Sequence, residues 1–222
     1  MTDHGYERLE EVIQDPVFPE VDLALRAGQH VDADDADRYA FLVAAQPLLE
    51  PLYIRYGAEL VRAPDGFFFL LPRGDRLGRR HLSTGEMLLG QTLALMYLDP
   101  ATVQAAGVVS RAQAMELLAN LVGEQRLIAA LNPRRRRHHE HVSHELARKE
   151  LDRALRSLST LGFIEILDEE KVRLRSPLMR FAEPVRGLAD PSAALQRLAR
   201  RGLVDLLELG PSEEPPEEGD EG

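Results

Sequence analysis

The residues 143-SHELARKELDRALRSLSTLGFIEILDEEKVRLR-175 predict a helix that is followed directly by a short β-hairpin. Ser143 suits the N-cap of this helix, and Gly162 suits its C-terminal end. The hairpin pairs residues 163–167 with 172–175 across an acidic turn. A helix followed at once by two strands is the second half of a winged helix, with the helix in the recognition position and the hairpin as the wing.

Helical spacing separates the side chains of the predicted helix into two faces. One face is apolar and consists of Ala147, Leu151, Ala154, Leu155 and Leu158, and basic side chains lie nearly opposite. Such a basic face is usually just exposed to solvent. Carboxylates on the helix and at the wing tip would also repel phosphate: Glu150, Asp152, Asp168, Glu169 and Glu170. We therefore predict a winged-helix fold first and a DNA surface second.

Composition limits the classes of protein that fit. The chain has 222 residues, enough for two small domains, and 44% of them are hydrophobic. The formal net charge is −10, but six acidic residues lie in the last twelve positions, so the remainder carries −4. This balance allows local contact with nucleic acid and argues against a protein that coats DNA generally.

Several kinds of site and location are excluded by what the sequence lacks. There is no cysteine, which excludes a disulfide scaffold, a thiolate metal site and a cysteine nucleophile. The charged N-terminus has no signal-peptide pattern, and no segment approaches the ~20 apolar residues that cross a bilayer. We therefore expect a cytoplasmic protein without a membrane partner.

Residues 18–76 repeat the plan of helices followed by a hairpin. A helix begins near Pro19 and ends near Gly28, and a second stretch of helix starts or restarts at Pro47 and Pro51. Residues 59–62 and 67–71 form the hairpin, joined by a turn over 63–66. We interpret this segment as a first winged-helix domain, preceded by an N-terminal helix within residues 1–17.

The return strand of this first hairpin is apolar on both faces. One face of an edge strand in a small domain should meet water, so either another element of the chain or a partner protein covers it. We weigh the two alternatives equally. The candidate protein-interface residues are Phe67, Phe68, Phe69, Leu70 and Leu71.

The rest of the chain divides into a linker, a second domain and a tail. A polar linker is expected at 77–82, followed by a second winged-helix domain with C-terminal helices over 83–209. Capping-box patterns at Ser83 and Ser110 mark helix starts in this domain. The acidic, proline-bearing residues 210–222 are predicted to be disordered. The fold class is thus α+β, mainly α with small β-hairpins, in tandem winged helices.

The densest positive region is the candidate DNA-contact surface. It combines a basic loop with the helix quoted above, and its residues are Arg134, Arg135, Arg136, Arg137, Arg148, Lys149, Arg153 and Arg156.

No catalytic constellation or cofactor site is evident. The neighbouring His138, His139, His141 and His144 lack a carboxylate or thiolate that would complete a metal site, so a metal-dependent catalytic loop is a weak alternative. The glycines lack the spacing and the lysine of a P-loop, and there is no nucleophile-elbow motif. We predict a protein that is not an enzyme and binds no cofactor or metal.

Several motifs recur in order along most of the chain, and those at 18–30 and 62–68 are more specific than the later ones. Their residues are Phe18, Pro19, Asp22, Ala24, Leu25, Arg26, Gly28, His30, Arg62, Ala63, Pro64, Gly66, Phe67, Phe68, Tyr97, Leu98, Leu158, Leu161, Gly162, Arg180 and Phe181. These motifs resemble those of the E-subunit family of MukBEF, a bacterial condensin of the structural-maintenance-of-chromosomes (SMC) type.

The resemblance implies a non-catalytic subunit with two winged-helix domains. Such subunits form homodimers and bind the central region of the kleisin subunit, which bridges the heads of the SMC ATPase. They act in chromosome condensation and segregation on the nucleoid and can contact double-stranded DNA without sequence specificity. The alternative is a tandem winged-helix transcription regulator, which would bind a specific DNA sequence.

Overall fold

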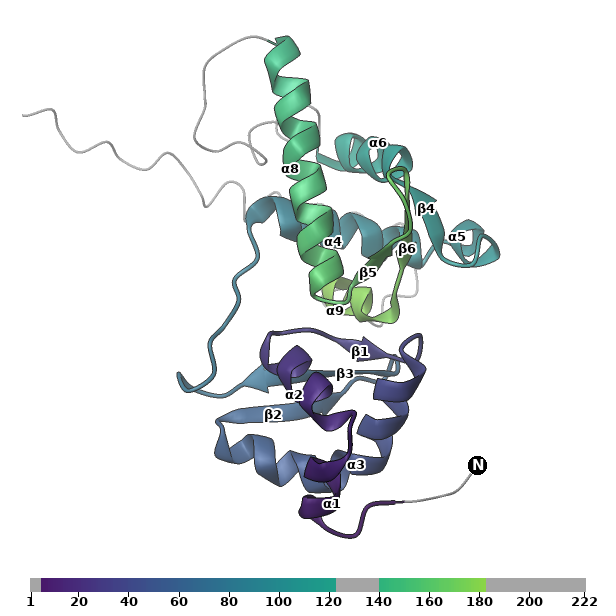
Figure 1. Cartoon of the computed structure of the whole chain (residues 1–222). Helices are drawn as coiled ribbons and strands as arrows, with labels where there is room; N and C mark the ends of the chain where they lie inside the picture. The colour runs from purple at the N-terminus through teal and green to yellow at the C-terminus, as the bar shows by residue number, and fades with distance from the viewer. Residues whose placement is uncertain (1–4, 123–139, 183–222) are drawn as a thin grey trace, which may run out of the picture.

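The computed structural model describes residues 5–122 and 140–182, and side chains for 5–120 and 149–182 (Figure 1). These residues form a mixed α+β structure with two small antiparallel sheets, which agrees with the predicted α+β class. The described residues bury two separate hydrophobic cores. One is built from residues 12–70 and the other from residues 88–182. We call the two parts the N-terminal unit and the C-terminal unit.

The N-terminal unit contains three helices and a three-stranded sheet of order β1-β3-β2. Its core surrounds Leu42, Leu49, Tyr53 and Phe68, all fully buried, and includes Val12 from the first helix. The elements are α1 (Leu9–Gln14), α2 (Phe18–Arg26), β1 (Val31–Asp32), α3 (Ala36–Arg55), β2 (Ala58–Arg62) and β3 (Phe67–Pro72).

The C-terminal unit has the equivalent sheet order, β4-β6-β5, and its helix α4 lies at the centre of the core. Gly90 of α4 allows Phe181 to pack against the helix, because a Cβ there would lie 2.4 Å from the ring. The elements are α4 (Thr84–Tyr97), α5 (Pro100–Gln104), β4 (Val108–Ser110), α6 (Arg111–Val122), α8 (Glu140–Thr160), β5 (Ile164–Ile166), β6 (Lys171–Leu174), the 3₁₀ turn η1 (Ser176–Leu178) and α9 (Met179–Ala182).

The structure corrects the prediction that a helix starts or restarts at the prolines. Helix α3 is continuous from Ala36 to Arg55 and contains both Pro47 and Pro51. A proline removes one helical hydrogen bond, which frees the carbonyls of Val43 and Pro47. Val43, Pro47 and Pro51 are all exposed, so these carbonyls lie on the side of the helix that water can reach. The opposite face of α3 forms the core and keeps the helix in one piece.

Helix α8 ends as predicted but begins earlier. It starts at Glu140, so Ser143 lies inside the helix and is not its N-cap. At the C-terminus, Gly162 has a φ of 78°, its N–H donates to Ser159 O, and Phe163 N donates to Leu158 O. These two bonds form a Schellman motif, for which glycine is the favoured residue.

Both predicted capping boxes are confirmed. Glu86 N donates to Ser83 Oγ (3.3 Å) while Ser83 N donates to a Glu86 carboxylate oxygen (2.6 Å). Gln113 and Ser110 form the same reciprocal pair at the start of α6. The loop Arg134–Arg137, the part of the predicted second domain that follows residue 182 and the tail lie outside the described residues.

Candidate functional site

The two units meet at His30, which follows α2, and at the turn that ends α8. His30 N and His30 Nδ1 both donate to Leu161 O, at 2.9 and 2.8 Å, and Arg180 Nη1 donates to His30 Nε2 at 2.8 Å. Because a carbonyl only accepts and a guanidinium only donates, the imidazole is neutral with its proton on Nδ1. Burial, and secondly the charge of Arg180, lower the pKa of His30 to about 3.

Aromatic rings surround the His30 imidazole from both units. Its ring centroid lies 4.4 Å from that of Phe163 in the C-terminal unit, and 5.6 and 5.9 Å from those of Phe69 and Phe67 on β3. The Arg180 guanidinium lies over Phe69, 4.1 Å from the ring centroid. Stacking of this kind favours a defined relative placement of the two units.

An ion pair joins the units on another part of the contact. Arg175, which follows β6, forms a salt bridge with Asp32 of β1, whose side chain is 3% exposed. Burial raises the pKa of Asp32 above its ordinary value, although Arg175 acts in the opposite direction. The pair therefore favours one geometry of the contact more than it stabilises the fold.

Gly162 allows a close backbone approach between the units. A Cβ at this position would lie 2.5 Å from His30 O and 3.3 Å from His30 N. Together with the left-handed φ, this approach leaves room only for glycine. We call the contacts of His30, Gly162, Phe163, Arg180 and the Asp32–Arg175 pair the joint.

The joint accounts for most of the predicted interface strand. Phe68 and Leu70 are buried in the core of the N-terminal unit, while Phe67, 1% exposed, and the half-buried Phe69 contact His30 on the other face. The chain itself thus covers both faces of β3 at these positions. Of the five predicted interface residues, Leu71 is the one that is exposed. A contact between this strand and a partner protein would therefore involve Leu71.

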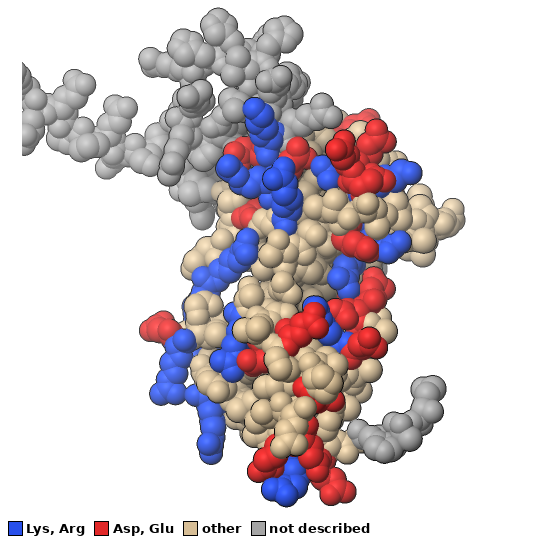
Figure 2. Space-filling model, in the orientation of Figure 1, with Lys and Arg blue, Asp and Glu red and all other residues tan. Residues whose placement is uncertain are grey.

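A groove of about 970 Å³ lies beside the joint, between the two units and the linker that connects them. Its apolar lining includes Phe69, Leu71, Phe163 and Met87. The charged residues that line it are all arginines, and no carboxylate lines it among the described residues: Arg26, Arg73, Arg79, Arg80 and Arg180. In Figure 2 the basic side chains gather along the left edge, where the linker runs in Figure 1.

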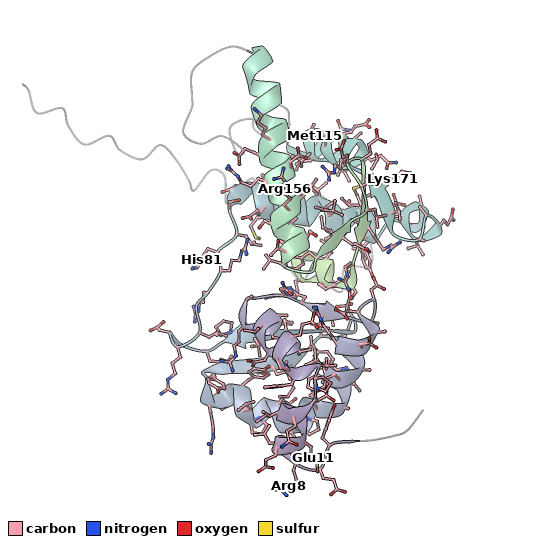
Figure 3. All side chains as sticks on the ribbon, viewed as in Figure 1. Arg8, Glu11, His81, Met115, Arg156 and Lys171 are labelled. Atoms are coloured by element: carbon pink, nitrogen blue, oxygen red, sulfur yellow. The ribbon has the colours of Figure 1, made fainter. Side chains whose placement is uncertain are left out.

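The predicted DNA-contact residues are only partly described. Lys149, Arg153 and Arg156 are exposed on α8, and Figure 3 shows Arg156 on the outer side of this helix. Arg148 lies within α8 and its side chain is outside the described set, as are Arg134, Arg135, Arg136 and Arg137 altogether.

Carboxylates partly neutralise this helix. Arg153 pairs with Glu150 at 2.9 Å, and Arg111 of α6 pairs with Asp152 at 2.9 Å. Arg156 lines a concavity together with Asp152, Glu169 and Glu170. The positive surface of the described part of α8 is therefore narrow.

Exposed apolar side chains on α2 and the end of α3 were not predicted as a surface. Leu23 is 69% exposed, Ile54 66% and Tyr56 44%. The two helices contact each other through Tyr53, whose hydroxyl donates to Asp22 at 3.1 Å, and through Arg26, which lies over the Tyr56 ring. The sequence does contain a signal for this surface, because Leu23 lies outside the apolar helix face formed by Val21, Ala24 and Leu25.

Within the described residues, no group of three or more histidines, acidic residues or cysteines could hold a metal ion, and no helix is long and apolar enough to span a bilayer. The four histidines considered as a metal site have no described side chains.

Comparison with known proteins identifies the family. A family described as MukE-like matches residues 6–220, nearly the whole chain. The chain belongs to the MukE-like family. The resemblance found in the sequence is thereby confirmed.

Curated relatives cover the chain almost completely. The chromosome partition protein MukE of Escherichia coli O157:H7 is 34% identical over 208 residues, which cover 90% of each chain. The protein of the same name from Vibrio cholerae serotype O1 is 37% identical over 210 residues, 94% of this chain and 90% of the relative. That of Haemophilus ducreyi is 36% identical over 203 residues, with coverages of 88% and 83%.

Proposed function

We propose that this chain acts in chromosome partition and condensation as a non-catalytic subunit of a bacterial SMC condensin. The observation that carries the proposal is the family match over residues 6–220, together with relatives that are named chromosome partition proteins. Such a subunit works in the cytoplasm, on the nucleoid, and leaves ATP hydrolysis to the ATPase of the complex.

The sheet orders support a tandem winged-helix architecture. In each unit an isolated strand pairs with the second strand of a hairpin, which gives β1-β3-β2 and β4-β6-β5. In the C-terminal unit, helices α4 and α5 precede the isolated strand and α6 and α8 follow it. The N-terminal unit has the single helix α3 between β1 and β2. The proposed domains are 18–76 and 83–209, with the linker at 77–82.

The proposed partners are a second copy of the chain, the kleisin subunit and, through the kleisin, the SMC ATPase. The exposed Leu23, Ile54 and Tyr56 give the N-terminal unit an apolar surface that favours association. The exposed Leu71 adds apolar surface at the mouth of the groove. Burial of these side chains against a partner would remove apolar area from water.

Light scattering coupled to size exclusion tests this proposal. The protein alone is expected to elute as a dimer, and addition of the central region of the cognate kleisin is expected to give a larger complex of defined mass. Ile54→Glu should shift the dimer toward the monomer, whereas Val103→Glu, at a residue equally exposed on α5, should not. A monomer that ignores the kleisin would falsify the proposal.

Double-stranded DNA is a subsidiary partner in this proposal, bound without sequence specificity through the exposed basic residues of α8. Reversing Lys149, Arg153 and Arg156 to glutamate should weaken DNA binding and leave the kleisin complex intact. In the matched control variant, the exposed Arg8, Arg55 and Arg62 are changed to glutamate instead. The slope of log affinity against log salt should fall by about 0.9 for each phosphate that the variant no longer binds. Loss of the kleisin complex in the first variant would show that this face has another role.

The exposed basic face of α8 is also compatible with a second candidate function, that of a transcription regulator. That function predicts tight binding to one DNA sequence and discrimination of at least about 10³-fold against other sequences. Binding that is indifferent to sequence excludes it.

A further inference from the structure

The groove beside the joint combines features of a site for an acidic peptide. Its floor is apolar, with Phe69 and Phe163 from the two units, and its charged lining consists of arginines. Aromatic and aliphatic floors bind side chains by burial, and arginines on the rim select carboxylates.

The arginines of the groove are not equally available. Arg26 and Arg73 already pair with Asp22 and Glu59, and Arg80 donates to Ser157 Oγ at 2.8 Å near the Glu86 carboxylate. Arg79 and Arg180 have no carboxylate partner among the described residues. Burial lowers the pKa of Arg180, and no anionic group of the described residues offsets this effect. A ligand carboxylate would supply the missing charge.

The chain carries a segment of matching charge. Its last twelve residues contain no lysine or arginine and six acidic residues: Glu213, Glu214, Glu217, Glu218, Asp220 and Glu221. The described chain ends at Ala182, next to Phe181 and Arg180, which line the groove. About thirty residues lie between Ala182 and Glu213, and an extended chain of that length spans up to roughly 100 Å. The tail can therefore reach the groove of its own chain.

We propose that the acidic C-terminal segment 213–221 binds in cis to the arginine-lined groove between the two units and the linker. Bound there, the segment supplies carboxylates to Arg79 and Arg180 and occupies the mouth of the groove. Any other acidic peptide then has to displace the tail, so the tail acts as an internal competitor.

The absence of native cysteine allows a direct test by disulfide trapping in the full-length chain. One cysteine replaces Gly219 within the acidic segment. A second replaces Gly78, which lines the groove and has no atom of the described residues within 4 Å of its Cβ position. The matched control pairs Gly219→Cys with Gly5→Cys, another exposed glycine with open space around its Cβ position.

The intramolecular disulfide is expected to form about tenfold faster with Gly78→Cys than with Gly5→Cys, which corresponds to about 1.4 kcal/mol. Loop length alone favours the Gly78 pair by only about twofold. The excess should disappear when the six carboxylates are changed to amides, and at 1 M salt, where the screening length falls to about 3 Å.

Two further variants test the groove itself. Arg79→Glu should slow trapping at Gly78→Cys, whereas Arg8→Glu, at the far end of the N-terminal unit in Figure 3, should leave the rate unchanged. A rate ratio no greater than the twofold loop effect overturns the proposal, as does a ratio that is independent of salt. Disulfide-linked dimers in place of intramolecular bonds at low protein concentration would place the tail on a second copy and overturn binding in cis.

Discussion

The hairpins β2–β3 and β5–β6 occupy the same place in sheets of the same order, yet the chain uses them differently. Strand β3 presents Phe67 and Phe69 to the other unit and becomes part of the joint. The tip of β5–β6 presents Asp168, Glu169 and Glu170 to solvent. The comparison shows that side-chain chemistry, and not the topology of the sheet, decides whether a hairpin becomes an internal contact or an exposed surface.

Two arginines that lie two residues apart, in and after β6, show the same contrast between a contact inside the joint and a contact open to solvent. Arg175 pairs with Asp32 across the joint, and these side chains are 18% and 3% exposed. Arg173 pairs with Glu165 across the hairpin, where the values are 44% and 50%. The two pairs are therefore expected to differ several-fold in the stability that is lost when one partner alone is removed.

Arg175→Met is expected to have the largest effect, because it leaves the Asp32 carboxylate buried without its partner. The expected loss in free energy of unfolding is about 3–5 kcal/mol, measured by urea denaturation. The double variant Asp32→Asn/Arg175→Met should recover most of this loss, since it removes both charges. Exposed ion pairs contribute less than about 1 kcal/mol. A loss in that range for the single variant would show that Asp32 and Arg175 are not paired inside the joint.

Gly162→Ala should weaken the joint through a steric contact with His30. Gly74→Ala is the matched control, because Gly74 has a φ of 81° but no atom within 4 Å of its Cβ position. Both variants incur the cost of the left-handed conformation, about 1–2 kcal/mol. The Gly162 variant should lose about 1–3 kcal/mol more because of the crowding. Equal losses in the two variants would indicate that the units separate easily at this position.

The neutral His30 makes the joint sensitive to acid. Its pKa is about 3 in the folded chain and about 6.5 when exposed, so the unfolded chain binds the proton first as pH falls. This contribution to stability is complete above about pH 6.5 and decreases below it, by about 2 kcal/mol at pH 5.

Unfolding measured from about pH 7 to about pH 5 checks this dependence on pH. His30→Phe should remove the decrease, although it lowers stability overall, because Leu161 O keeps only its bond from the backbone N–H of residue 30 and Arg180 loses its acceptor. His81→Gln, at an exposed histidine of the linker, should retain it. A decrease that survives in His30→Phe would assign the effect to another group.

Glu165→Gln tests the exposed pair and should have the smallest effect. Its expected loss is about 0.2–1 kcal/mol, and it should vanish in about 1 M salt because the pair is open to solvent. A larger loss, or one that persists in high salt, would contradict the contrast between the two pairs.

Local signals in the sequence predicted much of the fold. Pro64 and Gly66 marked the first hairpin, Ser83 and Ser110 marked two helix starts, and Gly162 marked the end of α8. Strands β1 and β4 were not predicted, because they have only two and three residues and are defined by pairing with distant hairpins. The continuity of α3 was also missed, because packing of its buried face outweighs the two prolines.

The candidate site was predictable only in part. The apolar pattern of residues 67–71 indicates that both faces of the strand are covered. The pattern does not distinguish cover by a partner protein from cover by another element of the same chain. Periodicity cannot identify His30 and Phe163 as the cover, because the contact joins residues 131 positions apart, as in the bond from His30 to Leu161. The arginine-lined groove was missed for the same reason, since its lining comes from both units and the linker.

The long separation across the joint has a consequence for synthesis of the protein. The N-terminal unit is complete once residue 72 has left the ribosome, but Phe163 and Gly162 are made roughly ninety residues later. At about 5–20 residues per second, the aromatic face of β3 waits about 5–20 s for the C-terminal unit that completes its cover. During that interval Phe67 and Phe69 have His30 beside them but lack the C-terminal unit, and incompletely covered apolar surface of this kind is bound by chaperones and promotes aggregation.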